Sequence, residues 1–537
     1  AGVRLPQTMM FDYPTSAQIA QFVQTALMTK AEATTPANKP PTQAVVSDCA
    51  LSYENKAVVV LAVACYAPGG CTDCPGFWSL LGSGHDCLQK IPVNRFDVDA
   101  LDGTVLALNA KQAHFLAHPE QFDNSCFKIS PAEAAAMDPH QRLLLEADYA
   151  ALASCSESRS SLMGGDIGVF VGVMTDGEWS TCQQKAMQGQ AMSAFAANGS
   201  GPAGLCGRAS FVLGLKGPCF SVTTVCSSSL VALDAASQNL QLGRCSAALV
   251  GGVNMISDAV GFLAYGAALA PDGKCKTFDA AANGLGRGDA CGVAVLHAEL
   301  SDTSSIVCIA GSAVNQDGRS ASMSAPNGPS QVEVLQSVLS QIQTSMLRQC
   351  SEMHGTGTAL GDPIEVGALR TAIDTGRDHS AAMVLGALKS RLGHTEGAAG
   401  VMGVLKAVLV LSRCGSLPNL HLDVANPKLD LDGFTVVMAS GLVALNPHED
   451  QSVLESVLTS GVSSFGMSGT NAHTLLIKES ITSSVCGQFC VVQYSHMSFE
   501  WWQQQGNVEA STTISLLGNQ TAPTDESALM WERSWPI

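Results

Sequence analysis

The middle of the chain, from about residue 56 to 478, alternates short apolar runs with longer stretches of helical character. The apolar runs fall at 57–64, 167–173, 247–253 and 384–388, and glycine-rich turns separate them from their neighbours. Continuous apolar runs of this length are typical of strands that are buried on both faces. Their regular alternation with helices predicts an α/β fold in which sheets and helices are layered.

The two flanks of this region show different patterns. Apolar residues recur at helical spacing from Ile19 to Leu27, which predicts a short capped helix within residues 1–30. Residues 31–54 are rich in Ala, Thr, Pro and Gln without a sustained period, a composition that is typical of a linker. The segment 479–537 contains Ser and Gln runs and several tryptophans but no clear period, so we expect a weakly structured flank.

Charge and composition exclude several classes of protein. Among the 537 residues, 46 acidic and 28 basic side chains leave a net charge of −18. Hydrophobic residues make up 46% of the chain, too many for a disordered acidic protein. The acidic balance argues against a nucleic-acid partner. No apolar run reaches the ~18 residues that a membrane-spanning helix needs, so no membrane span is expected.

The 19 cysteines are odd in number and irregular in spacing, which does not fit a secreted disulfide framework. Free thiols in a reducing compartment fit better, and we expect a cytoplasmic location, with an organelle as the alternative. Cys71 and Cys74 have the spacing of half a zinc site, but no second pair follows within reach. A loop with reduced thiols and no metal is therefore the expectation.

Cys226 is the strongest candidate for a nucleophile. The β-branched run that ends at Val225 predicts a buried strand, and residues 230–236 predict a helix, so Cys226 lies on the turn between them. At the beginning of a helix, the dipole and the free backbone N–H groups favour a thiolate and lower its pKa. The same N–H groups can bind an oxyanion. A purely structural thiol is the alternative.

Two histidines lie in tightly constrained turns. His354 precedes the sequence Gly-Thr-Gly-Thr, and His394 follows Gly393 ahead of a helix of small residues at 398–410. A turn residue bonded to the backbone is the alternative for each.

Three other functional motifs are excluded by the sequence. There is no GxxxxGK[ST] phosphate loop, the glycines at 284–288 lack dinucleotide-fingerprint spacing, and there is no GxSxG nucleophile elbow.

The segments around Cys226, His354 and His394 belong to a longer series of motifs along the chain. The motifs and their order resemble the β-ketoacyl synthase (ketosynthase) domain of modular type I polyketide synthases, from about residue 57 to 478. The matching segments are 137–142, 220–230, 271–279, 315–318, 325–328, 354–365, 389–396 and 464–473.

The resemblance implies an α/β fold of the thiolase type, with five αβαβα layers built from two similar halves. The first half, 55–300, would supply Cys226, and the second half, 301–478, would supply both histidines. Domains of this family are normally homodimers.

The resemblance also implies an activity. Cys226 would accept an acyl chain as a thioester, and His354 and His394 would promote decarboxylation of malonyl-carrier protein and hold the resulting enolate. The expected reaction is a decarboxylative Claisen condensation that extends the chain by two carbons. A fatty-acid-type ketosynthase with the same chemistry is one alternative. A non-elongating domain that transfers acyl groups or acts as a dimerisation scaffold is another, although the presence of Cys226 and His354 favours activity.

Further residues match supporting positions of the family. Lys389 and Glu396 match an ion pair near the second histidine. The backbone N–H groups of Cys226 and Phe465 match the oxyanion hole, and Phe278 matches a residue that gates the acyl pocket.

The chain also resembles part of a longer synthase. Residues 1–30 resemble the end of an acyl carrier protein domain, without the serine that carries phosphopantetheine. The ketosynthase itself would bind no cofactor, because its substrates arrive on the phosphopantetheine of an acyl carrier protein. An acyltransferase would lie elsewhere in the synthase, and the role of 479–537 is not indicated.

Three departures from the family pattern lie beside the candidate catalytic residues. Thr223, Val225 and Met353 stand where these domains usually have Asp, Ala and Ala. No catalytic group is lost, but Val225 and Met353 are next to reacting residues. We expect them to narrow the pocket and to affect substrate choice and rate more than the class of reaction.

Overall fold

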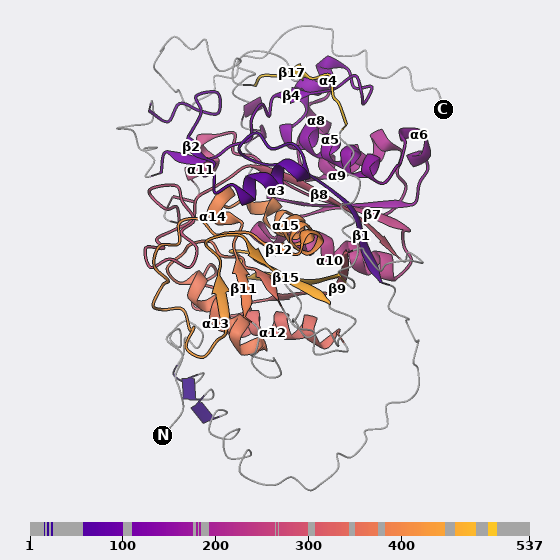
Figure 1. Ribbon diagram of the computed structural model, residues 1–537. Coiled ribbons are helices and arrows are strands. Elements are labelled where there is room, and N and C mark those ends of the chain that lie inside the picture. Colours follow the sequence, from indigo (N-terminus) through magenta and orange to yellow (C-terminus); the bar gives the residue numbers. More distant parts are fainter. Residues whose placement is uncertain are drawn as a thin grey trace, which may run out of the picture.

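A mixed sheet of 11 strands runs through the molecule in the computed structural model (Figure 1). The structure describes residues 57–99, 110–174, 193–263, 268–298, 307–342, 349–373, 382–445, 457–478 and 492–501, with 16, 19–20, 23–24, 179–180, 182–183 and 265–266. The predicted carrier-protein remnant (1–30), apart from those few positions, and the predicted linker (31–54) lie outside the described residues.

The first half of the chain supplies one side of this sheet. From the centre outward its strands are β1 (Val58–Tyr66), β8 (Ala290–Ala298), β7 (Ala247–Asn254), β5 (Ile167–Val173) and β6 (Cys219–Val222). The pairs β1–β8 and β8–β7 are antiparallel, whereas β7–β5 and β5–β6 are parallel.

The second half of the chain supplies the other side with the same pattern. From the centre outward its strands are β9 (Val307–Gln316), β16 (Thr470–Lys478), β15 (Leu458–Phe465), β10 (Cys350–Glu352), β11 (Met383–Gly386) and β13 (Val436–Met438). The pairs β9–β16 and β16–β15 are antiparallel, and those that follow are parallel. The two halves therefore repeat one topology, and β1 joins them by pairing with both β8 and β9.

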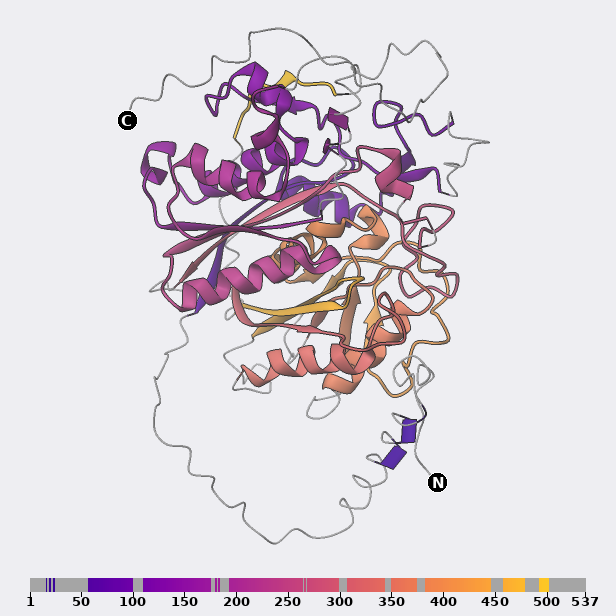
Figure 2. The ribbon, with the colours of Figure 1, turned by 180° about the vertical axis from the view of Figure 1, so that it is seen from behind.

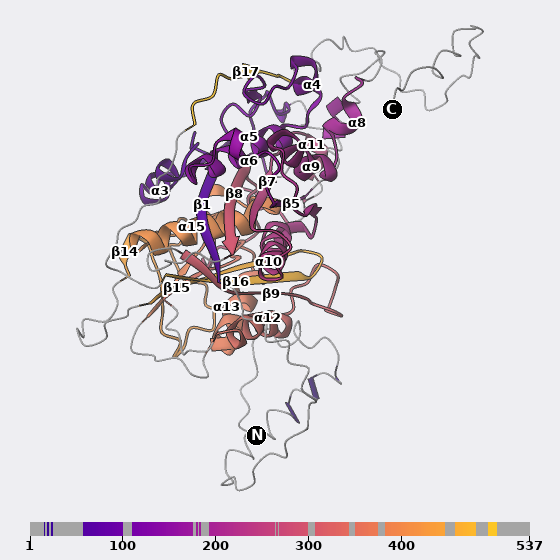
Figure 3. The same ribbon diagram turned by 90° about the vertical axis from the view of Figure 1, so that its right-hand side faces the viewer.

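Six long helices complete the layers. The helices are α5 (Pro139–Ser154) and α9 (Pro202–Leu213) on the outer face of the first half-sheet, α12 (Gly328–Ser340) and α13 (Gly361–Ile373) on the outer face of the second, and α10 (Ser228–Gln241) and α15 (Ala399–Arg413) between the half-sheets. Figures 1 and 3 show these layers in section, and Figure 2 shows α10 between the two parts of the sheet from behind. The predicted five-layered α/β fold of two similar halves is confirmed.

The central layer explains the composition of its helices. Every residue of α15 from Ala399 to Leu411 is buried, as expected for a helix that is apolar on all sides except at Lys406, whose ammonium group pairs with Glu352 (2.5 Å). A side chain at Gly400 would lie 2.7 Å from the backbone nitrogen of Leu230 on α10, so glycine allows the two helices to approach closely. Among the described residues, no helix has the length and apolar character needed to cross a membrane.

Shorter elements surround the layers. They are α3 (Cys74–Gly82), β2 (Leu88–Lys90), β3 (Gln112–His114), β4 (Gln121–Phe122), α4 (Pro131–Ala136), α6 (Arg159–Leu162), α8 (Ala196–Gly199), the 3₁₀ helix η2 (Val225–Ser227), α11 (Ala259–Leu263), α14 (Lys389–Leu392), η3 (Glu396–Ala398), β12 (Gly415–Ser416), β14 (Val443–Ala444) and β17 (Met497–Ser498).

The C-terminal segment 492–501 packs against the first half, so the expectation of a weakly structured flank is wrong for these ten residues. Strand β17 pairs antiparallel with β4. Trp501 is buried, with its ring next to the guanidinium groups of Arg95 and Arg142. Phe499 packs beside Phe122. A short strand with aromatic anchors has no hydrophobic period, and this is why the pattern of the sequence did not indicate it.

Candidate active site

Cys226 lies on a sharp turn between β6 and α10. The residue before it, Val225, adopts a left-handed backbone conformation with φ of +62°, which is rare for a β-branched residue. Side-chain hydroxyls hold this turn: Ser228 Oγ accepts from the N–H of Thr224 (2.9 Å) and donates to the carbonyl of Val225 (2.6 Å). The three successive serines after Cys226 include this Ser228, so the motif serves to shape the turn that presents the thiol.

The thiol of Cys226 is buried, and its charge state differs from the expectation. Burial raises the pKa of Cys226 to about 12, and the carboxylate of Glu396 adds to this rise. Lys389 and backbone N–H groups act in the opposite direction but are the smaller influences. The prediction of a lowered pKa at the helix start is therefore wrong, because desolvation of the thiolate outweighs the helix dipole.

His354 follows β10 and is held through its backbone. The carboxylate of Glu365 on α13 accepts hydrogen bonds from the N–H groups of His354 (2.5 Å) and Gly355 (2.8 Å). Thr277 donates to the carbonyl of Gly355 (2.7 Å). Burial raises the pKa of Glu365 to about 8 against the effect of the two N–H groups. The backbone of His354 and Gly355 is thus fixed to α13, and this sets the position from which the imidazole extends.

His394 follows α14 and is clamped by the segment 286–288. Its N–H donates to the carbonyl of Gly286 (2.6 Å), and its carbonyl accepts from the N–H of Gly288 (2.9 Å). Gly393 has a φ of +69°, and a side chain there would lie 2.6 Å from the carbonyl oxygen of Arg287. Glycine is therefore required at this position for both its conformation and its space.

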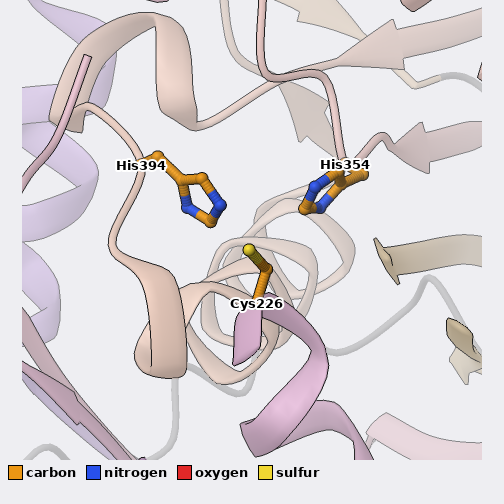
Figure 4. Close-up of side chains that lie close together, drawn as sticks. All are labelled: Cys226, His354 and His394. Atoms are coloured by element: carbon orange, nitrogen blue, oxygen red, sulfur yellow. The ribbon is translucent and has the colours of Figure 1, made fainter. Parts of the chain in front are cut away.

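The three candidate catalytic side chains converge. Figure 4 shows the sulfur of Cys226 directed toward the imidazoles of His354 and His394. One ligand-type atom from each of the three side chains lies within 4.8 Å of the others. The two imidazole centroids are 5.5 Å apart and their planes are nearly perpendicular, at 87°. The first half of the chain supplies the thiol and the second half both rings, as predicted.

Hydrogen bonds determine which ring nitrogen carries the proton. Nδ1 of His394 accepts from the N–H of Glu396 (3.0 Å), and Nδ1 of His354 accepts from the N–H of Phe465 (3.3 Å). Each neutral imidazole must therefore carry its proton on Nε2. Burial, followed by the charge of Lys389, lowers the pKa of both histidines well below the usual value, so both rings are neutral.

This arrangement supplies hydrogen-bond donors rather than metal ligands. A neutral imidazole binds a metal through a nitrogen lone pair, but the lone pairs on Nδ1 of His354 and His394 already accept hydrogen bonds, and Nε2 is protonated. Nε2 of His394 is buried without a hydrogen-bond partner among the described residues. Such N–H groups can donate to an oxygen on which negative charge develops.

Comparisons with known proteins agree with this geometry. The family model "Beta-ketoacyl synthase, N-terminal domain" matches residues 55–302, and "Beta-ketoacyl synthase, C-terminal domain" matches residues 306–423. The ketosynthase from module 6 of the bacillaene synthase of Bacillus subtilis 168 is 30% identical, with a TM-score of 0.71 over 80% of this chain and 73% of that one. The oxazolomycin ketosynthase domain OzmH KS7 of Streptomyces albus JA3453 is 30% identical, with a TM-score of 0.73 over 80% and 75%. The chain belongs to the β-ketoacyl synthase family.

Curated relatives of this ketosynthase are much longer proteins. Polyketide synthase GfsE of Streptomyces halstedii is 38% identical over 499 residues, which cover 90% of this chain and 13% of the relative. Erythronolide synthase EryA2 of Saccharopolyspora erythraea is 36% identical over 491 residues, which cover 88% and 13%. The chain thus spans only a small part of the synthases that it matches.

The predicted ion pair of this ketosynthase has a different cation. Glu396 was expected to pair with Lys389, but the structure pairs its carboxylate with Arg287, through Nε and through Nη2 (3.2 Å). Lys389 lies instead within electrostatic reach of the carboxylates of Glu352 and Glu365. Its desolvation lowers the pKa of Lys389. Sequence reasoning missed Arg287, although it lies in the Gly-x-Gly-x-Gly segment that was examined only as a dinucleotide motif.

Two other predicted residues of the ketosynthase occupy distinct positions. Phe465 directs its N–H into the site, where it bonds to His354. Phe278 is fully buried with a φ of +64°, and its N–H donates to Asp362 (2.9 Å). It packs in a hydrophobic cluster that includes Met353. The departure at Met353 is therefore part of the wall behind His354.

The cysteine-rich loop of the ketosynthase is separate from this site. Cys71 and Cys74 are both buried and belong to the hydrophobic core that also contains Cys65 and Cys87. Among the described residues, the spacing of metal ligands occurs only at Cys226, His354 and His394, so the pair at 71–74 lacks a third ligand at that distance.

Proposed function

We propose that this chain is the β-ketoacyl-[acyl carrier protein] synthase of a polyketide synthase and performs a decarboxylative Claisen condensation. One observation carries the proposal: a buried thiol lies close to two neutral imidazoles, each of which carries its proton on Nε2 because its Nδ1 accepts a backbone N–H. A thiol can hold an acyl group, and two N–H donors can stabilise the oxygen of an enolate. Membership of the β-ketoacyl synthase family agrees with both roles.

The first step loads the acyl chain onto Cys226. The sulfur attacks the thioester carbonyl of an acyl-phosphopantetheine, and the bond from that carbonyl to the phosphopantetheine sulfur breaks. Because Cys226 is protonated at rest, its proton is transferred to the departing phosphopantetheine sulfur, so the step ends with acyl-Cys226 and a neutral thiol. The N–H group of Cys226 is our candidate for holding the tetrahedral oxyanion, and the N–H of Phe465 would join it only by leaving Nδ1 of His354.

The second step forms the carbon–carbon bond. The carboxylate of malonyl-carrier protein leaves as CO₂, and the electron pair moves into the thioester carbonyl to give an enolate. His354 and His394 donate their Nε2–H groups to that oxygen. The enolate carbon attacks the acyl-Cys226 carbonyl, the thiolate of Cys226 leaves, and it regains a proton from solvent. The product is a β-ketoacyl-carrier protein that is two carbons longer.

The partners follow from this chemistry. An acyl carrier protein supplies both substrates on its phosphopantetheine, and an acyltransferase elsewhere in the synthase loads the malonyl units. The domain itself needs no resident cofactor. Every cysteine in the described part of the chain is a free thiol, and we therefore place the protein in a reducing compartment such as the cytoplasm.

We also propose that the protein is a homodimer that forms through β6. This strand ends the sheet, and Cys219 and Phe220 are both exposed although successive side chains point to opposite faces. Phe211 on the adjoining α9 is 85% exposed. A second copy that pairs its own β6 with this edge would continue the sheet across a two-fold axis and cover these residues.

Intact-mass measurement tests the enzymatic proposal. Incubation with acyl-phosphopantetheine thioesters should give a single acyl adduct, which Cys226→Ala abolishes. Cys275→Ala is the matched control, because Cys275 is equally buried and its pKa is also raised to about 12 by burial. Addition of malonyl-carrier protein should then release CO₂ and remove the adduct. An adduct that persists would support the non-elongating alternative, and a folded protein without any adduct would refute the proposal.

A further inference from the structure

Arg287 forms a buried connection to the second histidine. It holds the carboxylate of Glu396 through Nε and Nη2, and its third nitrogen, Nη1, donates to the carbonyl of Gly261 (2.9 Å). Both side chains of the pair are almost completely buried. The guanidinium also lies over the ring of Tyr265, 4.7 Å from its centroid. The whole fork of Arg287 is therefore engaged, in a geometry that an ammonium group cannot reproduce.

Glu396 is connected to His394 by its backbone and not by its side chain. Its N–H donates to Nδ1 of His394 (3.0 Å), while its carboxylate points to Arg287. Glu396 also adopts a φ of +45°, a conformation that non-glycine residues avoid. Such a conformation persists only where surrounding contacts maintain it. The buried ion pair with Arg287 is one such contact.

The hydrogen bond to Nδ1 decides what His394 can offer to a substrate. With Nδ1 as an acceptor, the proton is on Nε2 and the ring presents a donor to the site. If the N–H of Glu396 moves away, the proton can move to Nδ1, and Nε2 then presents a lone pair that repels a developing oxyanion. The tautomer of His394 thus depends on the position of one peptide group.

Arg287 also contacts His394 along the backbone. The two residues form an isolated parallel bridge, with the carbonyl and the N–H of His394 bonded to the residues on each side of Arg287. A displacement of Arg287 would therefore shift both ends of the short segment from His394 to Glu396. No other described arginine has this double connection to a candidate catalytic residue.

We propose that Arg287 is a positioning residue for the condensation: by holding Glu396, it keeps the N–H of Glu396 on Nδ1 of His394 and so maintains His394 as an Nε2–H donor. This inference rests on the proposed function, because it assigns a purpose to the donor in the decarboxylation step. It predicts that Arg287 matters for decarboxylation and not for the loading of Cys226.

Kinetic measurements on matched variants separate these two steps. In Arg287→Lys, acylation of Cys226 should stay within about twofold of the native rate, whereas decarboxylation of malonyl-carrier protein should fall at least about tenfold, as for the loss of an oriented donor. Arg95→Lys is the control. Arg95 is also buried, forms an ion pair with Asp289 (2.6 Å) and packs on an aromatic ring, but it has no contact with either histidine in the described structure.

Nitrogen NMR reads the tautomer directly. In protein labelled with ¹⁵N-histidine, and with His394 assigned by its loss in His394→Ala, the native ring should show a protonated Nε2 and an unprotonated Nδ1. Arg287→Lys should show a mixture of tautomers, and Arg95→Lys should match the native spectrum. If Arg287→Lys does not fold, Glu396→Gln replaces it, since it removes the ion pair with little change in shape.

The outcomes distinguish this inference from the proposed function. A native His394 with its proton on Nδ1 overturns the inference, as does an Arg287→Lys protein with the native tautomer and the decarboxylation rate of Arg95→Lys. Equal losses of acylation and decarboxylation in Arg287→Lys also overturn it. A native protein that neither accepts an acyl group nor decarboxylates malonyl-carrier protein refutes the proposed function instead, whatever the NMR spectrum shows.

Discussion

The surroundings of Cys226 keep its thiol protonated, which changes how this candidate nucleophile would have to act. A helix start favours a nearby anion by about 0.3–1 kcal/mol, whereas burial can move a pKa by up to about 3–5 units. Each unit corresponds to about 1.4 kcal/mol, so burial wins. The site therefore does not store a reactive thiolate. Under the proposed mechanism, the proton leaves Cys226 only when an acyl thioester has arrived, and the departing thiolate accepts it.

The reactivity of Cys226 should accordingly rise with pH over a wide range. With its pKa raised to about 12, the thiolate fraction grows about tenfold for each pH unit through neutrality and beyond. Site-specific mass spectrometry after iodoacetamide labelling between pH 6 and pH 10, in steps of about one unit, measures the rate at which Cys226 is alkylated. Free cysteine, which levels off near its pKa of about 8.5, is the control. A plateau for Cys226 near neutral pH would contradict the assignment.

At the residue scale, the sequence predicted the three side chains that converge in the structure but not the contacts that set their charge state and orientation. Cys226, His354 and His394 follow from motifs, because each lies in a short run of characteristic residues. Arg287 does not, since its partner Glu396 is far away along the chain and only the fold brings them together. The charge state of Cys226 could not be predicted from the sequence either, because it depends on burial by residues from both halves of the chain.

At the scale of elements, the segment 492–501 shows where hydrophobic periodicity fails as a guide. Its anchors are Phe499 and Trp501, whose rings lie beside the buried guanidinium of Arg142, 5.7 and 5.9 Å from its central carbon. Arg142 donates to the carbonyl of Phe499 (3.4 Å). Burial lowers the pKa of Arg142 to about 10, so this cation depends on the few contacts that remain to it. The long helices follow the sequence pattern more closely, whereas the strand that was predicted to be buried and to end at Val225 is the edge strand β6, which ends at Val222 and has exposed residues.

Replacement of Trp501 tests whether this segment stabilises the first half. Trp501→Ala should lower the free energy of unfolding by about 3–5 kcal/mol, the usual loss for a buried aromatic side chain, with a further effect from exposure of Arg142. Urea denaturation followed by circular dichroism measures the change. Ser498→Ala, at an exposed position of the same segment, should change it by less than about 0.5 kcal/mol. Equal effects of the two variants would show that the segment contributes little.

At the scale of the whole molecule, the exposed edge at β6 predicts an oligomer. Phe220→Asp places a charge on that edge, which should prevent pairing with a second copy and shift the protein from dimer to monomer at micromolar concentrations. Sedimentation velocity measures the change. Leu442→Asp is the control, because Leu442 is also exposed (67%) but lies far along the chain from β6, outside the large sheet. A native monomer, or a dimer that Phe220→Asp leaves intact, would place the interface elsewhere or exclude it.

The position of β1 has a consequence for the order in which the molecule can fold. Val58 to Val60 pair on one side with β8 and on the other with Val307 to Ile309 of β9, so the first strand of the described chain is not fully paired until the second half begins. During synthesis, the ribosome must deliver the entire first half before the second edge of β1 can be covered. Contacts so distant in sequence slow folding, and an uncovered edge favours aggregation in the meantime. The two halves repeat one topology, but neither can finish its sheet without the other.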